Sequence, residues 1–324
     1  MKSEPKRHPT EFAINMYLDK MMILQQSELK VVNDYNYFDE NSPCHIYFVC
    51  RRPRVIIDPT KFSATKKTIS LHFKIQKKDK FIDFPLDFEN PFKDENITVS
   101  SQYPFSTFQF KRNEETLLNA KTAVFLQSFE RHHTKAEFLD LEILYIGQSY
   151  GVDGARTAPD RLKSHSTLQG IYSTAIEKNP DFEIWLMLAS FEQLNIMMMD
   201  GRTKYTDEEI ETDKERFIGL HNKLNYEGIN EQQKINFTEA ALIRYFEPQY
   251  NIEYKNSFPN PAHKTYAECY ELDINSVAIE LETIEKANFK LFSHKIKPNW
   301  LHIKTFMLHS KKDRKDMFEI LPKG

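Results

Sequence analysis

The chain contains little cysteine and little glycine. Of its 324 residues, three are cysteine and eight are glycine. Cys44, Cys50 and Cys269 form no C-x-x-C pair and have no histidine at zinc-finger spacing, so the sequence suggests neither a disulfide framework nor a structural zinc. We expect three buried, reduced thiols. Few glycines also predict few tight turns.

A long apolar run and a strong net charge are missing as well. The longest apolar stretch, residues 184–190, is too short to cross a bilayer, and the first residues lack the apolar core of a signal peptide. A cytoplasmic protein without a membrane partner is the simplest expectation. The formal charge of −3 provides no overall positive field to attract nucleic acid. Any such contact depends on local basic patches.

The residues that are present indicate a globular, strand-rich protein. Hydrophobic residues make up 40% of the chain and aromatic residues 13%. Residues 1–40 are predicted to be helical, because Phe12, Met16 and Leu18 are mixed among charges. Residues 41–119 and 256–324 contain short β-branched and aromatic runs between turn formers. We expect both to be β-rich, to pack together as one accessory domain, and to offer a surface for a protein partner.

The central segment, residues 120–255, has a different organisation. Its pattern predicts strands at 121–129, 138–146 and 181–190, the last buried on both faces. A helix is expected at 160–177, and a helical insertion at 192–234. Another helix is expected at 237–246, with Thr238 as its cap and Pro248 as its stop.

Residues with chemical potential follow these predicted elements in order. Tyr145-Ile146-Gly147 ends the second strand, and Arg161 and His165 lie four apart on one helix face. Glu239 lies on a later helix, and Asn251 follows Pro248. Together they resemble the GIY-YIG nuclease superfamily. The resemblance implies an α+β fold with a small antiparallel three-stranded sheet flanked by helices, whose second strand carries the YIG tripeptide.

The resemblance also implies roles for these residues. Arg161 would hold a phosphate with its planar fork, and Glu239 would bind Mg²⁺ or Mn²⁺, which accept one carboxylate and fill the other positions with water. Tyr145 would accept a proton or orient water, while His165 and Asn251 would support the site. The implied activity is a metal-dependent endonuclease, with DNA favoured over RNA as the nucleic-acid partner.

Other interpretations remain open. Taken singly, Tyr145, Arg161, His165, Glu239 and Asn251 are ordinary strand, helix and turn residues. The family's first strand normally carries a tyrosine in the active site. The equivalent stretch here, residues 122–127, has Phe125 instead. A catalytically weakened nucleic-acid-binding or scaffold protein in a larger complex is therefore the alternative. A nuclease acting within a restriction or phage-defence assembly is a third possibility.

Overall fold

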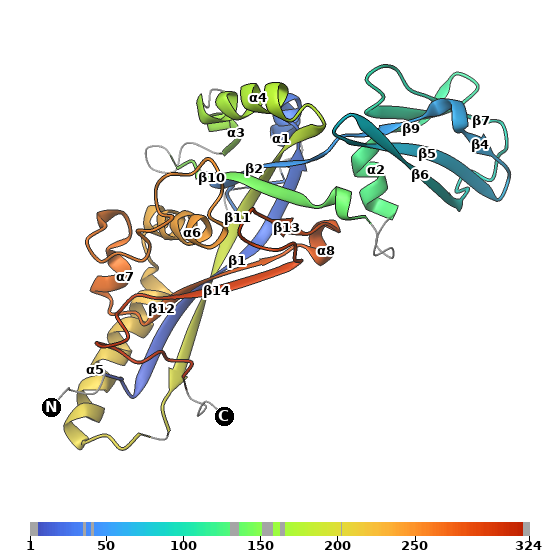
Figure 1. Cartoon of the computed structure of the whole chain (residues 1–324). Coiled ribbons are helices and arrows are strands. Elements are labelled where there is room, and N and C mark those ends of the chain that lie inside the picture. Colours follow the sequence, from blue (N-terminus) through green and yellow to red (C-terminus); the bar gives the residue numbers. More distant parts are fainter. Residues whose placement is uncertain are drawn as a thin grey trace.

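The computed structural model describes residues 6–34, 37–39, 42–129, 136–150, 158–162, 166–201 and 203–319. This part of the chain has a mixed α/β architecture built on a seven-stranded sheet. Figure 1 shows an elongated molecule in which a smaller β-rich region projects at one end and helix α5 lies at the other. The spatial order of the large sheet is β13 (Leu291–Phe292), β10 (Leu141–Gln148), β2 (Ile46–Pro53), β11 (Phe182–Met199), β1 (Thr10–Leu24), β12 (Ser276–Glu282) and β14 (Leu301–Met307).

Three adjacent strands, β10, β2 and β11, form an antiparallel unit in the middle of this sheet. Residues 184–190 of β11 are all buried, so the expectation of a strand covered on both faces is confirmed. Helices lie on opposite faces. The buried residues of α4 (Ser166–Lys178) join one apolar cluster, and those of α6 (Glu231–Phe246) join the other. The unit is thus an antiparallel trio with a helix on each side.

The prediction of a helical segment at 1–40 is wrong for most of its length. Strand β1 occupies 15 residues of it, and among the residues of this segment that the structure describes only α1 (Leu29–Asp34) and a short 3-10 turn before it are helical. Phe12, Met16 and Leu18 are all even-numbered, so they satisfy a period of two as well as a helical spacing. The pairing of β1 with β11 shifts in register after Leu18, so even-numbered side chains before and after the shift face different sides of the sheet. Because β1 is a central strand, apolar residues lie on both of its faces. The alternation of apolar and polar residues that marks a half-exposed strand is therefore not visible in its sequence.

The predicted strand at 121–129 is helix α2 (Thr122–Phe129). Its exposed positions, Val124 and Ser128, are four residues apart, which is the helical period. Phe125 does not face the core sheet. Its ring packs against Phe108 and Phe129 at centroid distances of 4.9 and 4.7 Å. The aromatic residues in this stretch therefore build the core of the projecting region.

That projecting region is a chain insertion between β2 and β10. One of its sheets contains β3 (Val55–Ile57), β4 (Ser63–Ala64), β5 (Thr68–Lys77) and β6 (Lys80–Glu89), and the other contains β7 (Ile97–Ser100), β8 (Thr107–Arg112) and β9 (Glu115–Lys121). The β-rich character expected of residues 41–119 is confirmed. The described residues do not form the expected single accessory domain: β12, β13 and β14 extend the large sheet, which also contains β2 of residues 41–119, whereas β3 to β9 form the two smaller sheets. Strands β12 to β14 lie in the large sheet because the long β1 offers β12 a parallel partner.

The helical predictions in the middle of the chain hold in part. Residues 160–177 fall in α3 (Ala158–Leu162) and α4, and 163–165 lie outside the described residues. Residues 192–234 are only partly helical, because β11 continues to Met199 along its partner β1. Then follow α5 (Asp207–Asn222), a π-helical turn (Lys223–Glu227) and the start of α6. Asn230, not Thr238, caps α6, which ends at Phe246 before Pro248 as expected. Short helices α7 (Glu268–Glu271) and α8 (Ile284–Ala287) complete the described α-helices.

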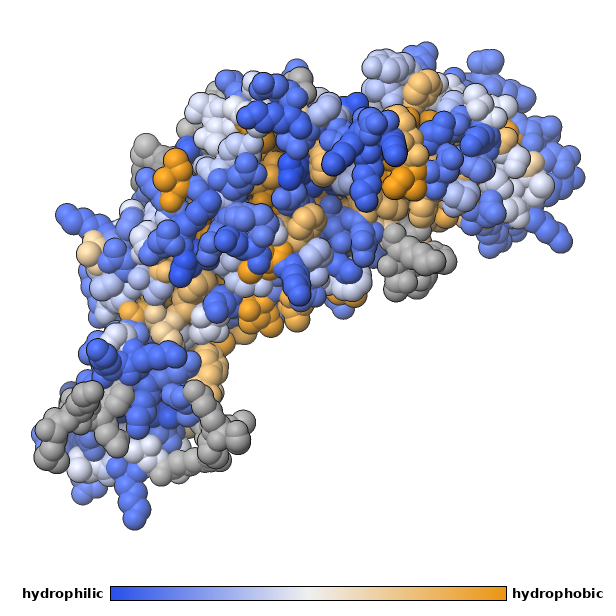
Figure 2. Space-filling view, viewed as in Figure 1, coloured by the Kyte–Doolittle hydropathy of each residue, from blue (hydrophilic) through white to orange (hydrophobic). Residues whose placement is uncertain are grey.

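Polar residues cover much of the molecular surface. Figure 2 shows hydrophilic side chains over most of the visible face, including the insertion. Cys44, Cys50 and Cys269 are buried free thiols, as expected. Within the described residues, no helix has the length and apolar character needed to cross a membrane.

Candidate active site

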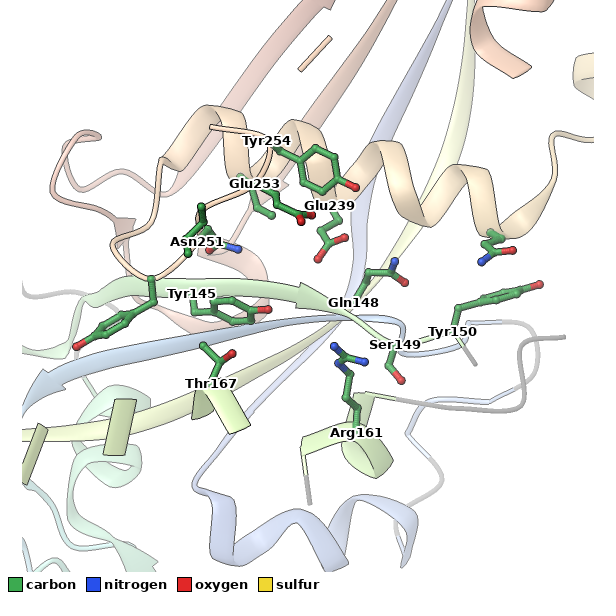
Figure 3. A pocket seen from close by; sticks show the side chains of 14 residues that line it. Tyr145, Gln148, Ser149, Tyr150, Arg161, Thr167, Glu239, Asn251, Glu253 and Tyr254 are labelled. Atoms are coloured by element: carbon green, nitrogen blue, oxygen red, sulfur yellow. The ribbon is translucent and has the colours of Figure 1, made fainter. Parts of the chain in front are cut away.

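A cavity of about 570 Å³ opens at one edge of the antiparallel trio. Four of the five candidate residues belong to it. Tyr145 comes from β10, Arg161 from α3, Glu239 from α6, and Asn251 from the segment after α6. In Figure 3, Glu239 and Arg161 reach from opposite sides toward the end of β10. The fifth candidate, His165, lies outside the described residues.

The cavity forms at this edge because β10 is only partly paired on its outer side. Strand β13 pairs with β10 only at Leu141 and Glu142, which leaves the following residues without a neighbouring strand. The side chain of Asn251 fills this place. Its Oδ1 accepts a hydrogen bond from the Ile146 amide at 2.9 Å, and its Nδ2 donates to the Ile146 carbonyl at 2.8 Å. Asn251 therefore satisfies the strand's backbone and fixes β10 beside the cavity.

The strand that pairs with β10 is β2, not residues 121–129, and it carries Tyr47. This tyrosine is fully buried. Its hydroxyl accepts a hydrogen bond from Nε of Arg161 at 3.2 Å, and its ring lies 6.2 Å from that of Tyr145. The expectation that Phe125 stands in the place of a first-strand tyrosine is therefore wrong. Sequence inspection missed Tyr47 because it precedes Tyr145 by 98 positions.

Gly147 lies between the two tyrosines. A Cβ atom at this position would lie 2.5 Å from Cζ of Tyr47 and 2.8 Å from Cε1 of Tyr145, closer than any real contact. Both neighbours are rings in a packed strand pair, so neither can turn away without disturbing the site. The glycine at the end of Tyr145-Ile146-Gly147 is thus required by packing between the two aromatic rings.

We expect Gly147→Ala to destabilise the protein by about 1–3 kcal/mol, the usual cost of overpacking. Urea unfolding would measure it. Gly170→Ala on α4 is a matched control, because no atom lies within 4 Å of its added Cβ, and it should keep or slightly raise stability. Equal unfolding midpoints for the two variants would contradict this account of Gly147.

The carboxyl group of Glu239 has a strongly shifted pKa in the cavity. Burial raises its pKa to about 8, while nearby Arg161 lowers it and Glu253 raises it again. Hydrogen bonds from Gln148 lower it further without cancelling the effect of burial. Gln148 is itself held by Asn236, whose Oδ1 accepts from its Nε2 at 2.8 Å. Arg161 and Gln148 therefore compensate only part of the cost of burying a negative charge on Glu239.

The two tyrosines are neutral phenols at neutral pH. Burial raises the pKa of Tyr145, and Glu239 adds to this effect, whereas Arg161 opposes it. Burial also raises the pKa of Tyr47. A neutral phenol both donates and accepts hydrogen bonds. Tyr145, which faces the cavity, can therefore orient a water molecule, but it is not an ionised base in the metal-free protein.

The donor set fits a hard divalent cation. A cation beside Glu239 would offset the cost of burying its carboxylate, and Glu253 offers a second carboxylate on the same cavity. Mg²⁺ characteristically uses one or two carboxylates and several waters. Among the described residues, no group of three or more His, Cys, Asp or Glu side chains converges on one point.

The cavity also contains residues that sequence inspection did not select: Gln148, Glu253 and Tyr254. Tyr254 adopts a left-handed backbone with φ of 64°, which is unusual for a tyrosine and places it over the cavity. Their nearness in the sequence to candidate residues was the signal that could have found them, because Gln148 directly follows Tyr145-Ile146-Gly147 and Glu253 and Tyr254 follow Asn251. No family model, curated protein or solved structure matched the chain, so the interpretation of this site rests on its own geometry.

Proposed function

We propose that this chain is a divalent-metal-dependent endonuclease of the GIY-YIG type, which hydrolyses phosphodiester bonds in DNA. The observation that carries the proposal is the gathering of Tyr145, Arg161 and Glu239 around one cavity, with buried Tyr47 bonded to Arg161 behind it. These residues come from four separate elements, and Gly147 is required for two of them to meet. Residues 45–47, His-Ile-Tyr, also match the family's first-strand tripeptide at two of three positions.

Each residue has a defined part in this proposal. The Arg161 guanidinium holds the phosphate and balances charge that develops on its oxygens. Tyr47 is a positioning residue that fixes Arg161 through its hydroxyl. Tyr145 orients the attacking water. Glu239, with Glu253 beside it, would hold the cation, which supplies Lewis-acid stabilisation of the phosphate oxygens when bound.

The test is a cleavage assay on labelled single-stranded DNA, duplex DNA and RNA, with Mg²⁺, Mn²⁺ or EDTA. We expect the full-length protein to cut DNA only when a divalent cation is present. A matched set of Glu239→Gln and Glu231→Gln isolates the site, because both substitutions lie on α6 and only Glu239 lines the cavity. DNA cleavage that persists in EDTA, or that Glu239→Gln leaves intact, would refute the proposal.

We expect Tyr145→Phe to lower the cleavage rate by about 10²-fold, because its hydroxyl faces the water and the phosphate. Tyr47→Phe should cost about 10-fold, because it acts through Arg161. The double variant Tyr47→Phe with Arg161→Ala should then be no slower than Arg161→Ala alone, since the two residues act as a unit. Tyr226→Phe is the control, because Tyr226 is exposed and does not line the cavity. Additive losses would contradict the positioning role of Tyr47.

The alternative of a binding or scaffold protein was motivated by a first strand without tyrosine. Because β2, the strand paired with β10, carries Tyr47, this reason for the alternative no longer applies. A setting in restriction or phage defence stays a proposal, which copurification of native complexes would examine.

A further inference from the structure

A second cavity, of about 700 Å³, lies where the insertion meets the core. Its lining combines aromatic rings with one cation, Arg54, and one carboxylate, Glu183. Tyr103 comes from the insertion, Tyr172 from α4 and Phe182 from the start of β11, and Arg54 lies at the junction between core and insertion. Tyr103 is 87% exposed, so its ring is free to take a partner. Flat rings beside a guanidinium are suited to stack on a nucleobase and hold its phosphate.

Helix α4 connects the two cavities. Thr167 in its first turn lines the active-site cavity, while Tyr172 and Ala175 farther along line the second one. Thr167 and Ala175 are eight residues apart on this helix, so they are separated by about 12 Å along its axis at 1.5 Å per residue. At a spacing of about 3.4 Å per nucleotide, this length corresponds to roughly three to four nucleotides of one strand. One nucleic-acid strand can therefore reach both cavities.

The outward face of α4 suits such a path. Ser166, Gln169, Gly170 and Ser173 are exposed and follow the helical spacing, so they form one stripe between the cavities. None of these four carries a charge that would repel phosphate, and the next exposed position at this spacing, Glu177, lies beyond Ala175. Ser and Gln side chains donate hydrogen bonds to phosphate and sugar oxygens. At Gly170, no atom lies within 4 Å of a Cβ position, which leaves room for a backbone to approach.

We propose that the substrate is single-stranded over this path, with its scissile phosphate at Arg161 and unpaired bases stacked on Tyr103 and its aromatic neighbours. This inference rests on the proposed nuclease function and names the substrate form that the same site accepts. Unpaired bases are required because duplex bases cover each other's faces. Arg161 and Arg54 are the only cations among the described residues that line the two cavities. Stacking, which is sequence-tolerant, then supplies much of the affinity.

The test is fluorescence anisotropy of labelled 12-nucleotide single-stranded DNA, single-stranded RNA and duplex DNA, in EDTA to prevent cleavage. We expect single strands to bind more tightly than the duplex. Tyr103→Ala and Arg54→Ala should each weaken single-strand binding by about 5-fold to 100-fold. Tyr226→Ala is the matched control, because this tyrosine is 77% exposed on the helical turn after α5, and it should bind as wild type does.

A separate pair of glycine substitutions tests the path along α4. Gly170→Glu places a negative charge midway between the cavities and should weaken binding. Gly219→Glu makes the same change on α5, where a Cβ also meets no atom within 4 Å, and should have no effect. Weakening by Gly219→Glu equal to that by Gly170→Glu would point to net charge alone and overturn the path.

Two outcomes separate this inference from the nuclease proposal. Metal-dependent cleavage with Tyr103→Ala binding as tightly as Tyr226→Ala would overturn the single-strand path and leave the nuclease intact. Single-strand binding that needs Tyr103 and Arg54, without cleavage in any metal, would support the path and refute the nuclease. Tighter binding of duplex than of single strands, or no binding of any nucleic acid, would overturn the inference.

Discussion

Glu239→Gln should lower metal-dependent cleavage by about 10³-fold and, in the metal-free protein, raise stability at pH 8. The loss of activity follows because an amide cannot supply the negative oxygen that holds a divalent cation. The gain in stability follows from the raised pKa of about 8. Folded protein keeps a proton on Glu239 up to that pH, whereas the unfolded chain releases it near 4.5.

The proton on Glu239 therefore favours the folded state fully below about pH 4.5, and this contribution is lost as the pH rises through about 8. Glutamine carries no charge at any pH, so the variant avoids the loss. We expect a difference on the order of 2 kcal/mol at pH 8, reduced by water in the open cavity, and none at pH 4.5. Urea titrations at the two pH values in EDTA would measure it.

Saturating Mn²⁺ provides the internal check on the Glu239 variant. Wild type should gain stability from a cation that binds only the folded state, and Glu239→Gln should gain much less. Glu231→Gln, on the exposed start of the same helix, should follow wild type in cleavage and in its response to Mn²⁺. If Glu239→Gln unfolds more easily than wild type at pH 8 without metal, the buried carboxylate does not lower stability. Glu239 would then not be a residue that is kept for function at the expense of stability.

Arg161→Ala should lower cleavage by about 10²-fold to 10³-fold, since no other cation among the described residues lines the active-site cavity. Arg161→Lys should recover only a small part of the rate. A lysine keeps the positive charge but lacks the planar fork that can meet the phosphate while Nε still donates to Tyr47. Single-turnover cleavage at saturating metal is the measurement.

Arg112→Ala is the control for Arg161, because Arg112 pairs with Asp94 in the insertion and does not line either cavity. Its cleavage rate should equal that of wild type. Full activity in Arg161→Lys would show that charge alone is sufficient and would contradict the role assigned to the hydrogen bond with Tyr47.

The parts of the fold that could be predicted were those fixed by local pattern. Strand β11 was marked by a continuous apolar run, and α6 by helical spacing ended by Pro248. Tyr145, Arg161, Glu239 and Asn251 were found through their order along elements of this kind. Each of them lies on the cavity.

The parts that could not be predicted depend on distant pairing. Tyr47 lies on a strand whose partner is some hundred residues later, and nothing near Tyr47 identifies that partner. Strand β1 resembled a helix because burial on both faces hides a period of two. The role of Asn251 depends on where β13 stops pairing with β10, which only the assembled sheet reveals.

The insertion between β2 and β10 has a consequence for the order of folding. Arg51 and Glu142 form an ion pair at 2.7 Å across these strands, although they are 91 positions apart. Closing so long a loop from an unfolded chain is entropically costly and slow. If the insertion folds first around its own phenylalanine core, it brings the two strand ends near each other and makes their pairing effectively local. The active site would then form after the insertion, and its assembly rate would depend on the stability of a region that contributes none of its catalytic residues.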